Sequence, residues 1–445
     1  MENRSPESLF VTPVTNTIAE VAAPTLAPAP PRLRRADRSQ FLIRPQTLDE
    51  ALEPDHPARI VWTLVTRWDL DGFLAKIKAR GERPGRAAID PVILISLWLY
   101  AYSRNVGNGR ELDRLCEKHD AYRWICGGVP MNYHTLNDFR VTHEEALDGL
   151  LTQMIAALTS QNLVSVERVS IDGTRQRAGA GRRSFKTCET IEKHLVEAKA
   201  HVEAMKKQAA DPNASLQRQR AADRAARERN ERLEKALAEV KKIEEAKSKQ
   251  KNKPSKHQPA KASTTDPEAR QMHVSNGGTA PAMNVQFAVA VEGRAIVGVE
   301  VTNAGSDVHQ SEPMREQVEK RSGQKVKDIL IDGGFIGLDN IDAAAEAGTT
   351  IYAPVPKPKK EETDRHQPKK GDSDAVAEWR ARMGTDAAKA IYKQRASTVE
   401  TANGECKTYR GLGQFLVRGI DKVRCIALWS ALAYNVIHFG GKLIA

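Results

Sequence analysis

Cysteine is scarce in this chain of 445 residues, and no two cysteines form a CxxC pair. The five that occur are scattered and odd in number: Cys116, Cys126, Cys188, Cys406 and Cys425. This pattern argues against a zinc ribbon or a disulfide framework, and it suits the reducing cytoplasm.

Long apolar runs are also missing. The two longest are VILISLWLYAY at 92–102 and CIALWSALAY at 425–434, and both fall short of the roughly 20 residues that a membrane-spanning helix needs. We expect core helices there and no membrane segment. The N-terminal stretch is rich in Pro, Ala and Thr and lacks a continuous apolar signal segment. For residues 1–44 we therefore expect a disordered tail rather than an export signal.

Positive charge is abundant. Lys and Arg number 68 against 57 Asp and Glu, which gives a net charge of +11 and a sequence pI of about 9.3. Such a balance favours a polyanionic partner, nucleic acid before membrane, although it says nothing about the fold.

Residues 45–160 show apolar positions at helical spacing. Asp90-Pro91 is a helix start signal, with a cap residue followed by Pro at the first helical position. Short helices joined by Gly-containing turns are compatible with a helix-turn-helix-like DNA-binding domain. A plain helical docking domain is about as good an interpretation. In the first case the candidate DNA contacts are Arg110, Thr135, Asn137 and Arg140.

The stretch VSVERVSID at 164–172 predicts a strand, and GTRQRAGAGRRSFK follows it. We interpret this second stretch as a flexible cationic loop that leaves the strand tip and contacts DNA phosphates. A solvated basic loop is the plainer alternative. The cations are Arg175, Arg177, Arg182, Arg183 and Lys186.

Residues 187–263 predict an inserted antiparallel helical hairpin followed by a polar linker. Apolar positions step by four and three in both arms, and Asp211-Pro212-Asn213 breaks the helix between them. The first arm has Ile191, Leu195, Ala198, Val202 and Met205, and the second has Ala226, Asn230, Leu233, Leu237 and Val240.

The remaining segments, 161–186 and 264–445, predict one α/β domain. MNVQFAVAVEG and AIVGVEVTN form a hairpin, and helices then alternate with the strands KVKDILIDGG and TTIYAPVP before a long helical C-terminal region. Three antiparallel strands followed by two that alternate with helices give a mixed five-stranded sheet. This is the order of an RNase H-like fold.

Two strands of that sheet carry the same ending. VSIDGTR holds Asp172 and ILIDGGF holds Asp332. Asp-Gly is a common turn dipeptide, which would explain either one alone. The fold order, however, places these strands side by side, and two neighbouring carboxylates require a shared proton or a cation between them. The sequence therefore predicts a pair of adjacent carboxylates that share a proton or hold cations, and a third acid would favour a metal site.

A third acid lies in YKQRASTVETANGECK. Glu400 and Lys407 are seven residues apart, about two helical turns, so they would share a helix face. Arg395, five residues before Glu400, would lie about 140° off that face and would reach the site only if the segment bends. Glu405 and Glu346 are rival acids.

Taken in order, these motifs resemble the bacterial insertion-sequence transposases of the DDE type. The likeness covers about residues 45–440 and rests on DGTRQRAGAG, the hairpin, LIDGGF, YKQRASTVETANGECK and AYN, with DPVILISLWLYAYSRNVGNGRELDRLC and YHTLNDFR in the helical N-terminal block. The family's Tyr-Arg-Glu-Lys signature maps onto Tyr392, Arg395, Glu400 and Lys407. The gap from Arg395 to Glu400 is one residue longer than in the best-known form of that signature.

The resemblance implies that Asp172, Asp332 and Glu400 hold two Mg²⁺ ions, with Mn²⁺ as a substitute, and that Arg395 and Lys407 join the basic residues in contacting DNA. It implies a DNA transposase that cleaves and joins its own element ends, working in the cytoplasm at the nucleoid as a homodimer or larger assembly. A nuclease without strand transfer and a DNA-binding derivative without catalysis are the alternatives.

Overall fold

The computed structural model describes residues 45–80, 87–208, 216–249, 259–274, 277–358 and 364–445. The tail expected at 1–44 and the helix break expected at 211–213 lie outside these residues. Residues Gln46–Ala445 pack as one unit. Among the helices in the described ranges, none is long and apolar enough to cross a membrane.

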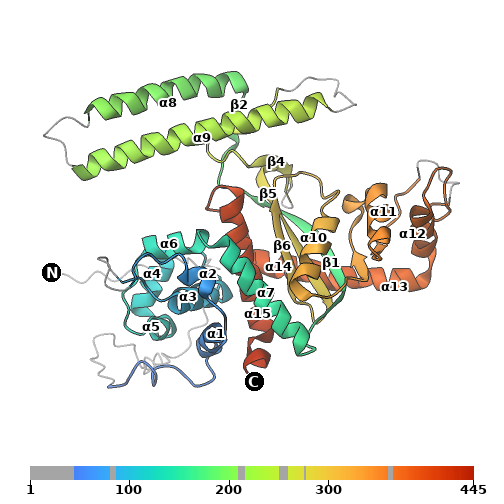
Figure 1. Cartoon of the computed structure of the whole chain (residues 1–445), viewed down its shortest axis with the longest axis horizontal. Coiled ribbons are helices and arrows are strands. Elements are labelled where there is room, and N and C mark those ends of the chain that lie inside the picture. Colours follow the sequence, from blue (N-terminus) through green and yellow to red (C-terminus); the bar gives the residue numbers. More distant parts are fainter. Residues whose placement is uncertain (1–44, 81–86, 209–215, 250–258, 275–276, 359–363) are drawn as a thin grey trace, which may run out of the picture. The chain divides into compact units, whose positions relative to one another are not determined.

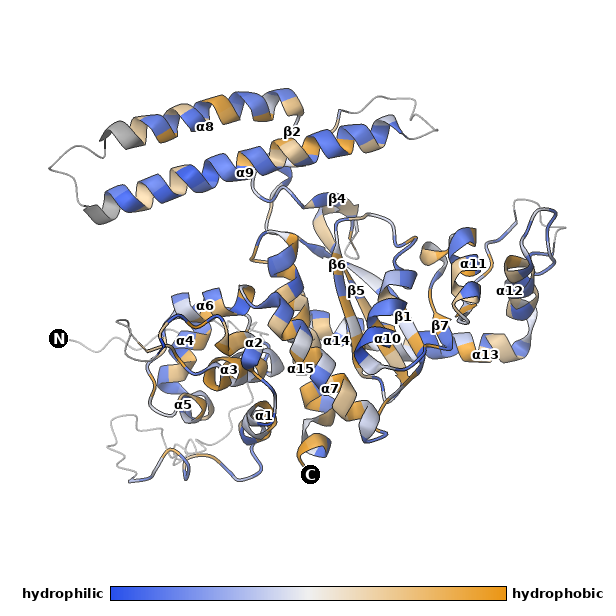
Figure 2. Cartoon of the chain, in the orientation of Figure 1, coloured by the Kyte–Doolittle hydropathy of each residue, from blue (hydrophilic) through white to orange (hydrophobic). Residues whose placement is uncertain are grey.

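The described N-terminal region is helical, as predicted. Its central helix α3 begins where Asp90 accepts a hydrogen bond from the Val92 backbone N at 2.8 Å and Pro91 takes the first helical position. This helix is apolar on all sides (Figure 2), so its neighbours surround and bury it. The helices are α1 (Pro57–Thr66), α2 (Asp71–Leu74), α3 (Pro91–Ser103), α4 (Gly109–Lys118), α5 (Asp120–Cys126), α6 (Tyr133–Val141) and α7 (Glu144–Ser160).

The next layer is a mixed sheet with the order β6–β5–β1–β7–β8, which confirms the RNase H-like α/β fold. β1 lies antiparallel to β5 and parallel to β7, and β7 is parallel to β8. A short strand, β4, extends the edge formed by β6, because Gly277 and Gly278 with positive φ turn the chain back into β5. The strands are β1 (Ser165–Arg177), β4 (Arg270–His273), β5 (Thr279–Glu292), β6 (Ile296–Thr302), β7 (Asp328–Leu330) and β8 (Thr350–Tyr352).

The register of β1 and β7 corrects one expectation. Arg168 lies opposite Asp328, 160 positions later, and β7 stops two residues further on at Leu330. β1 instead continues to Arg177 beside β5, and at Arg177 a single parallel bridge joins it to Gln414 on the other side. Asp172 therefore does not end its strand, as the sequence suggested, but lies just beyond the point where β1 loses its parallel neighbour.

Helices cover the sheet and join it to the N-terminal region (Figure 1). In the long helix α15, Trp429 donates its indole N–H to the Arg140 carbonyl at 3.0 Å, and Asn435 bonds both the backbone N and O of Ile296 at 2.9 Å. The helical segments after β6 are α10 (Ser311–Ser322), α11 (Leu338–Glu346), α12 (Asp374–Gly384), α13 (Asp386–Arg395), the π-helical turn η3 (Ala396–Glu400), α14 (Thr401–Tyr409) and α15 (Ile420–Ile444).

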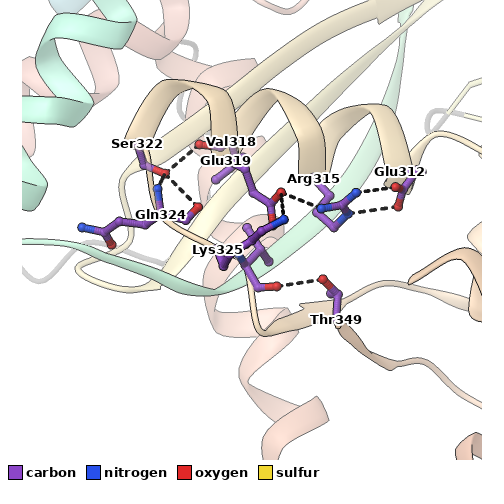
Figure 3. Close-up of polar contacts among 9 residues, drawn as sticks. Glu312, Arg315, Val318, Glu319, Ser322, Gln324, Lys325 and Thr349 are labelled. Atoms are coloured by element: carbon purple, nitrogen blue, oxygen red, sulfur yellow. Dashed lines mark hydrogen bonds and ion pairs between the residues drawn. The ribbon is translucent and has the colours of Figure 1, made fainter. Parts of the chain in front are cut away.

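Helix α10 and its exit toward β7 are fixed by their own polar contacts (Figure 3). Arg315 bridges Glu312 and Glu319, with 2.6 Å between its Nη1 and Glu319 Oε2. At the following turn, Thr349 donates its hydroxyl to the Val326 carbonyl at 2.8 Å. These contacts fix the start of β7, the strand that leads to Asp332.

The predicted insertion is a pair of long helices lying side by side (Figure 1), α8 (Cys188–Gln208) and α9 (Leu216–Ser248). Ile191, Leu195 and Ala198 pack against Leu233 and Val240, which confirms the inner face predicted for those positions. The end of the expected linker is ordered instead, because β3 (Ala262–Ser263) pairs with β2 (Phe185–Lys186) and closes the base of the pair.

Candidate active site

Three acidic side chains reach one region from three elements. Asp172 lies within β1, Asp332 follows β7, and Glu400 is the last residue of the π-helical turn. Asp332 caps the short helix η2 (Gly333–Phe335) by accepting a hydrogen bond from the Gly334 N at 2.7 Å. The exposed fraction of the side chain is 17% for Asp172, 43% for Asp332 and 52% for Glu400. Asp172 is therefore the innermost of the three.

The guanidinium of Arg395 joins the acids. Its Nη2 lies 3.1 Å from Asp172 Oδ1 and 4.0 Å from Asp332 Oδ2, and its Nη1 lies 2.7 Å from Glu400 Oε1. An α-helix would have turned Arg395 away from Glu400. A π turn closes hydrogen bonds between residues five apart, so it brings these two side chains onto one face. The bend that the sequence analysis required is this turn.

Burial raises the pKa of Asp172 to about 6, although Arg395 acts to lower it; the neighbouring acids Asp332, Asp307 and Glu400 raise it further. Asn403, one turn after Glu400, donates its side-chain N–H to Asp172 Oδ2 at 3.2 Å. Burial lowers the pKa of Lys407, and the charge of Asp172 opposes that shift. The negative charge of Asp172 therefore acts on Lys407, which remains a predicted phosphate contact.

The rival acids lie elsewhere. Glu405 pairs with Arg410 at 2.6 Å and with His438 at 3.1 Å, and Glu346 is the last residue of α11. Tyr392 is half-buried, and burial raises its pKa, with Arg395, Asp332 and Glu400 among the charges that act on it. The signature residues Tyr392, Arg395, Glu400 and Lys407 therefore gather around Asp172.

The fit of this site to divalent metal ions follows from its donors. Among the described residues, no three Asp, Glu, His or Cys side chains converge closely enough to hold a metal ion. The positively charged guanidinium of Arg395 lies between the carboxylates, where it takes the place of a metal cation. Carboxylate oxygens are the hard ligands that Mg²⁺ and Mn²⁺ prefer. The residues present therefore suit such ions once Arg395 gives way.

The basic segment after Asp172 is less loop-like than predicted. Arg175 and Arg177 belong to β1, whereas Arg182 and Arg183 lie beyond it and are exposed in the short helix η1 (Arg182–Ser184). Lys186 follows in β2 and is partly exposed. Strand pairing with β5 continues as far as Arg177, which lies opposite Ala282.

The two arginines proposed as DNA contacts in the N-terminal region differ in their exposure. Arg110 is exposed, with its guanidinium 5.0 Å from the centre of the Tyr133 ring. Arg140 is buried, bonds the Gly107 carbonyl and lies 4.8 Å from the centre of a Trp98 ring. Only 7% of Arg140 is exposed, which leaves little surface for a phosphate, so we no longer propose it as a DNA contact.

Thr135 and Asn137 have structural contacts. The backbone N of Thr135 donates to Asn132 Oδ1 at 2.9 Å, at the start of α6. The Asn137 side chain fills the space where a Cβ on Gly109 would stand.

Sequence reasoning missed two polar residues, one at the site and one on the opposite face of β1. Asn403 lies three residues after Glu400, a helical spacing that could have found it. Asp307 follows β6 and contacts Arg175 of β1 across a sequence separation of 132. No local signal marks such a contact, because only the sheet brings the two segments together.

The sheet order defines the class of fold, an RNase H-like α/β domain. Residues 255–436 match the family described as "Transposase DDE domain", and residues 46–142 match "Transposase domain (DUF772)". No curated protein and no solved structure matches the chain significantly. The chain belongs to the DDE transposases of insertion sequences and is a DNA transposase. The matched spans contain Asp332 and Glu400 but not Asp172, which lies before the helical insertion.

Proposed function

We propose that this transposase cleaves and joins the ends of its own insertion sequence, with Asp172, Asp332 and Glu400 as catalytic residues and metal ligands. The observation that carries the proposal is the sharing of one cation, Arg395, by acids from two neighbouring parallel strands and a following helix. Such acids have no structural reason to be collected beside a strand end, because each would be solvated more cheaply alone.

Two Mg²⁺ ions, or Mn²⁺ in their place, would stabilise the attacking and leaving oxygens of a phosphodiester when bound. Asp172, Asp332 and Glu400 would hold these ions, with Asp172 as the central ligand. Asp172 is suited to this role because it is the least exposed of the three and is oriented by Asn403. The raised pKa of Asp172 also favours an added positive charge, since a cation restores its ionised form.

The reaction has two steps on the same acids. Water attacks the phosphodiester at the element end, which leaves a 5′-phosphate on one side of the break and a 3′-hydroxyl on the other. That 3′-hydroxyl then attacks a phosphodiester of the target DNA, joins to its phosphate and displaces the 3′-hydroxyl of the target strand. Arg395 would leave the carboxylates and hold a phosphate of the bound strand, and Lys407 would do the same beside Asp172. Arg175, Arg177, Arg182, Arg183 and Lys186 would hold phosphates further along the DNA.

The wider assignments rest on the same function. The helical domain at 45–160 would bind the terminal repeat through Arg110, while 161–186 and 264–445 would form the catalytic domain and 187–263 its inserted helical pair. Bringing two element ends together requires at least two copies of the chain on DNA. We place the protein in the cytoplasm, at the nucleoid, with terminal repeats and target DNA as partners and no membrane association.

Strand joining tests this proposal against its nearest rival, a nuclease with the same acids. Purified protein is incubated with Mg²⁺, a labelled element end and an unlabelled supercoiled plasmid. We expect label to become covalently joined to the plasmid. Nicking of the end without joining would identify a nuclease, and binding without nicking would identify a derivative that has lost catalysis.

A further inference from the structure

A second polar cluster lies on the face of β1 opposite Asp172. Side chains alternate along a strand, so Gly173 and Arg175 face away from Asp172. There Asp307 Oδ1 accepts hydrogen bonds from Asn284 Nδ2 and Gln286 Nε2, both at 2.6 Å, and Asp307 Oδ2 accepts one from Arg175 Nη2 at 3.1 Å. The carboxylate of Asp307 is thus held by three donors.

Gly173 is required by this cluster. A Cβ at position 173 would come within 2.4 Å of both Asp307 Oδ1 and Gln286 Nε2. The sequence analysis placed a strand tip here, and Asp-Gly is a usual turn signal. The structure shows an uninterrupted strand in which the missing side chain makes room for Asp307.

Formation of the cluster leaves two buried amide oxygens without hydrogen-bond partners. Asn284 and Gln286 are fully buried, yet Asn284 Oδ1 and Gln286 Oε1 have no hydrogen-bond partner. Both amides are therefore committed to Asp307 through their N–H groups, and their oxygens are left unsatisfied. A loop could be attached to the sheet with fewer unmet hydrogen bonds. The arrangement is better explained by the need to fix the direction of one charged group.

That group is Arg175, whose side chain remains 31% exposed. Asp307 engages Nη2, and Nε is buried without a hydrogen-bond partner, so the Nη1 end of the planar guanidinium is the part left for a second anion. Arg175 is three residues beyond Asp172, about 10 Å along the strand at roughly 3.3 Å per residue. Because β7 has ended by this point, the edge of β1 beside Arg175 has no β7 neighbour.

We propose that Asp307 is a positioning residue that aims Arg175 at one DNA phosphate near the scissile bond. The inference rests on the proposed function, since it takes the DNA strand to run from Asp172 along β1. It assigns the contact to one backbone phosphate and involves no base.

The test measures affinity for a duplex that carries the element end, without divalent metal, as a function of salt. Asp307→Asn keeps an oxygen for the two amides but turns an N–H group toward Arg175, which displaces the guanidinium. We expect Arg175→Ala and Asp307→Asn to weaken binding equally, and the double variant to weaken it no further. Each should reduce the salt slope by about 0.9, the effect of one phosphate contact.

A matched control lies on the same strand. Arg168 and Asp328 form a second Arg–Asp pair, at 2.6 Å, where β1 meets β7. Asp328→Asn should leave both the affinity and the salt slope unchanged. Equal losses in Asp328→Asn and Asp307→Asn would show a general effect of breaking an ion pair, and tighter binding by Asp307→Asn would show that Asp307 merely neutralises Arg175. Either outcome overturns the proposal.

A scan with single methylphosphonates, which remove the charge of one phosphate at a time, locates the contact. One position near the cleavage site should weaken binding by the wild type and have no effect on Arg175→Ala or Asp307→Asn. Arg175→Lys provides a second route if Asp307→Asn does not fold. It keeps the charge but not the planar geometry, so it should lose this position-specific effect. Retention of the effect by the lysine variant would contradict the proposal.

These binding measurements are independent of catalysis. Wild-type protein that shows the phosphate-specific effect but never cleaves would refute the proposed function and leave the role of Asp307 intact. Wild-type protein that cleaves and joins DNA without the phosphate-specific effect would support the proposed function and refute the role of Asp307.

Discussion

Arg395 and Glu400 lie five residues apart and form an ion pair of 2.7 Å, because the chain between them is a π-helical turn. A π turn contains one more residue than the α-helical turn it replaces. The resemblance showed one extra residue between these two positions, and the turn accounts for it.

Deletion of Ser397 tests this account of the extra residue. Ser397 is exposed within the turn, and without it the segment can close as an ordinary α-helix, where residues four apart share a face. We expect the deletion variant to fold, to keep the Arg–Glu pair and to retain DNA cleavage. Deletion of Lys393, exposed in the preceding helix α13, is the matched control, and it should rotate Tyr392 away from the site. Equal loss of cleavage in both deletions would contradict the account.

Arg395 should compete with divalent metal for the three carboxylates. In Arg395→Gln the competing charge is gone, so we expect Mn²⁺ to bind the DNA-free protein about tenfold more tightly, a difference of about 1.4 kcal/mol. DNA cleavage should nevertheless fall, because a phosphate contact is lost. Calorimetric titration with Mn²⁺ measures the first effect. Weaker Mn²⁺ binding by Arg395→Gln would mean that Arg395 organises the ligands instead of competing with the metal.

Asp266 gives a prediction for stability against pH. It is fully buried, accepts a hydrogen bond from the Gly419 N at 3.2 Å, and has no partner for Oδ2. Burial raises the pKa of Asp266 to about 6, above its ordinary value, although the Gly419 bond acts to lower it. The folded state therefore holds a proton that the unfolded chain has released, so stability is lost as pH rises from about 4 to about 6.

Asp266→Asn removes this penalty. We expect the variant to be more stable than the wild type by about 1–3 kcal/mol above pH ~6, and the difference to vanish below pH ~4. Urea denaturation across this range measures it. A destabilisation of equal size at every pH would show that the carboxylate is charged in the folded protein.

Substitution of two arginines in the helical domain should affect different properties, stability in one case and DNA binding in the other. Arg140→Ala removes a buried group that bonds Gly107 and packs on Trp98, and it should lower the free energy of unfolding by about 2–4 kcal/mol. Arg110→Ala removes an exposed cation, and it should leave stability nearly unchanged while reducing the salt slope of DNA binding by about one contact. Thermal denaturation and binding to the element end distinguish the two. Weakened DNA binding by folded Arg140→Ala protein would reverse the correction made for that residue.

The sequence allowed the fold to be predicted because its signals are local. Alternating apolar residues marked β5 and β6, and Asp90-Pro91 marked the start of α3. The separation of Asp172 and Asp332 also carries information. It equals the 160-residue offset with which β1 pairs with β7, so Asp332 follows the end of β7 at the position that corresponds to Asp172 in β1.

The parts that could not be predicted depend on contacts between distant segments. Asp172-Gly173 has the composition of a turn, and only pairing with β5 and the demand of Asp307 for space keep it extended. Arg395 was placed off the face of Glu400 because a regular helix was assumed. The burial of Arg140 was hidden because Gly107 and Trp98 reach it from a turn and another helix.

The central claim is that Asp172, Asp332 and Glu400 carry the reaction, and neutral variants of the acids test it most directly. Glu400→Gln and Glu405→Gln are a matched pair on one helical segment, since Glu405 is occupied by Arg410 and His438. The measurement is Mg²⁺-dependent release of the 3′-hydroxyl at a labelled element end. We predict that Asp172→Asn, Asp332→Asn and Glu400→Gln reduce the rate at least about a thousandfold, a barrier increase of about 4 kcal/mol, while Glu405→Gln stays near wild type. Cleavage that survives Glu400→Gln and is lost in folded Glu405→Gln protein would contradict the account.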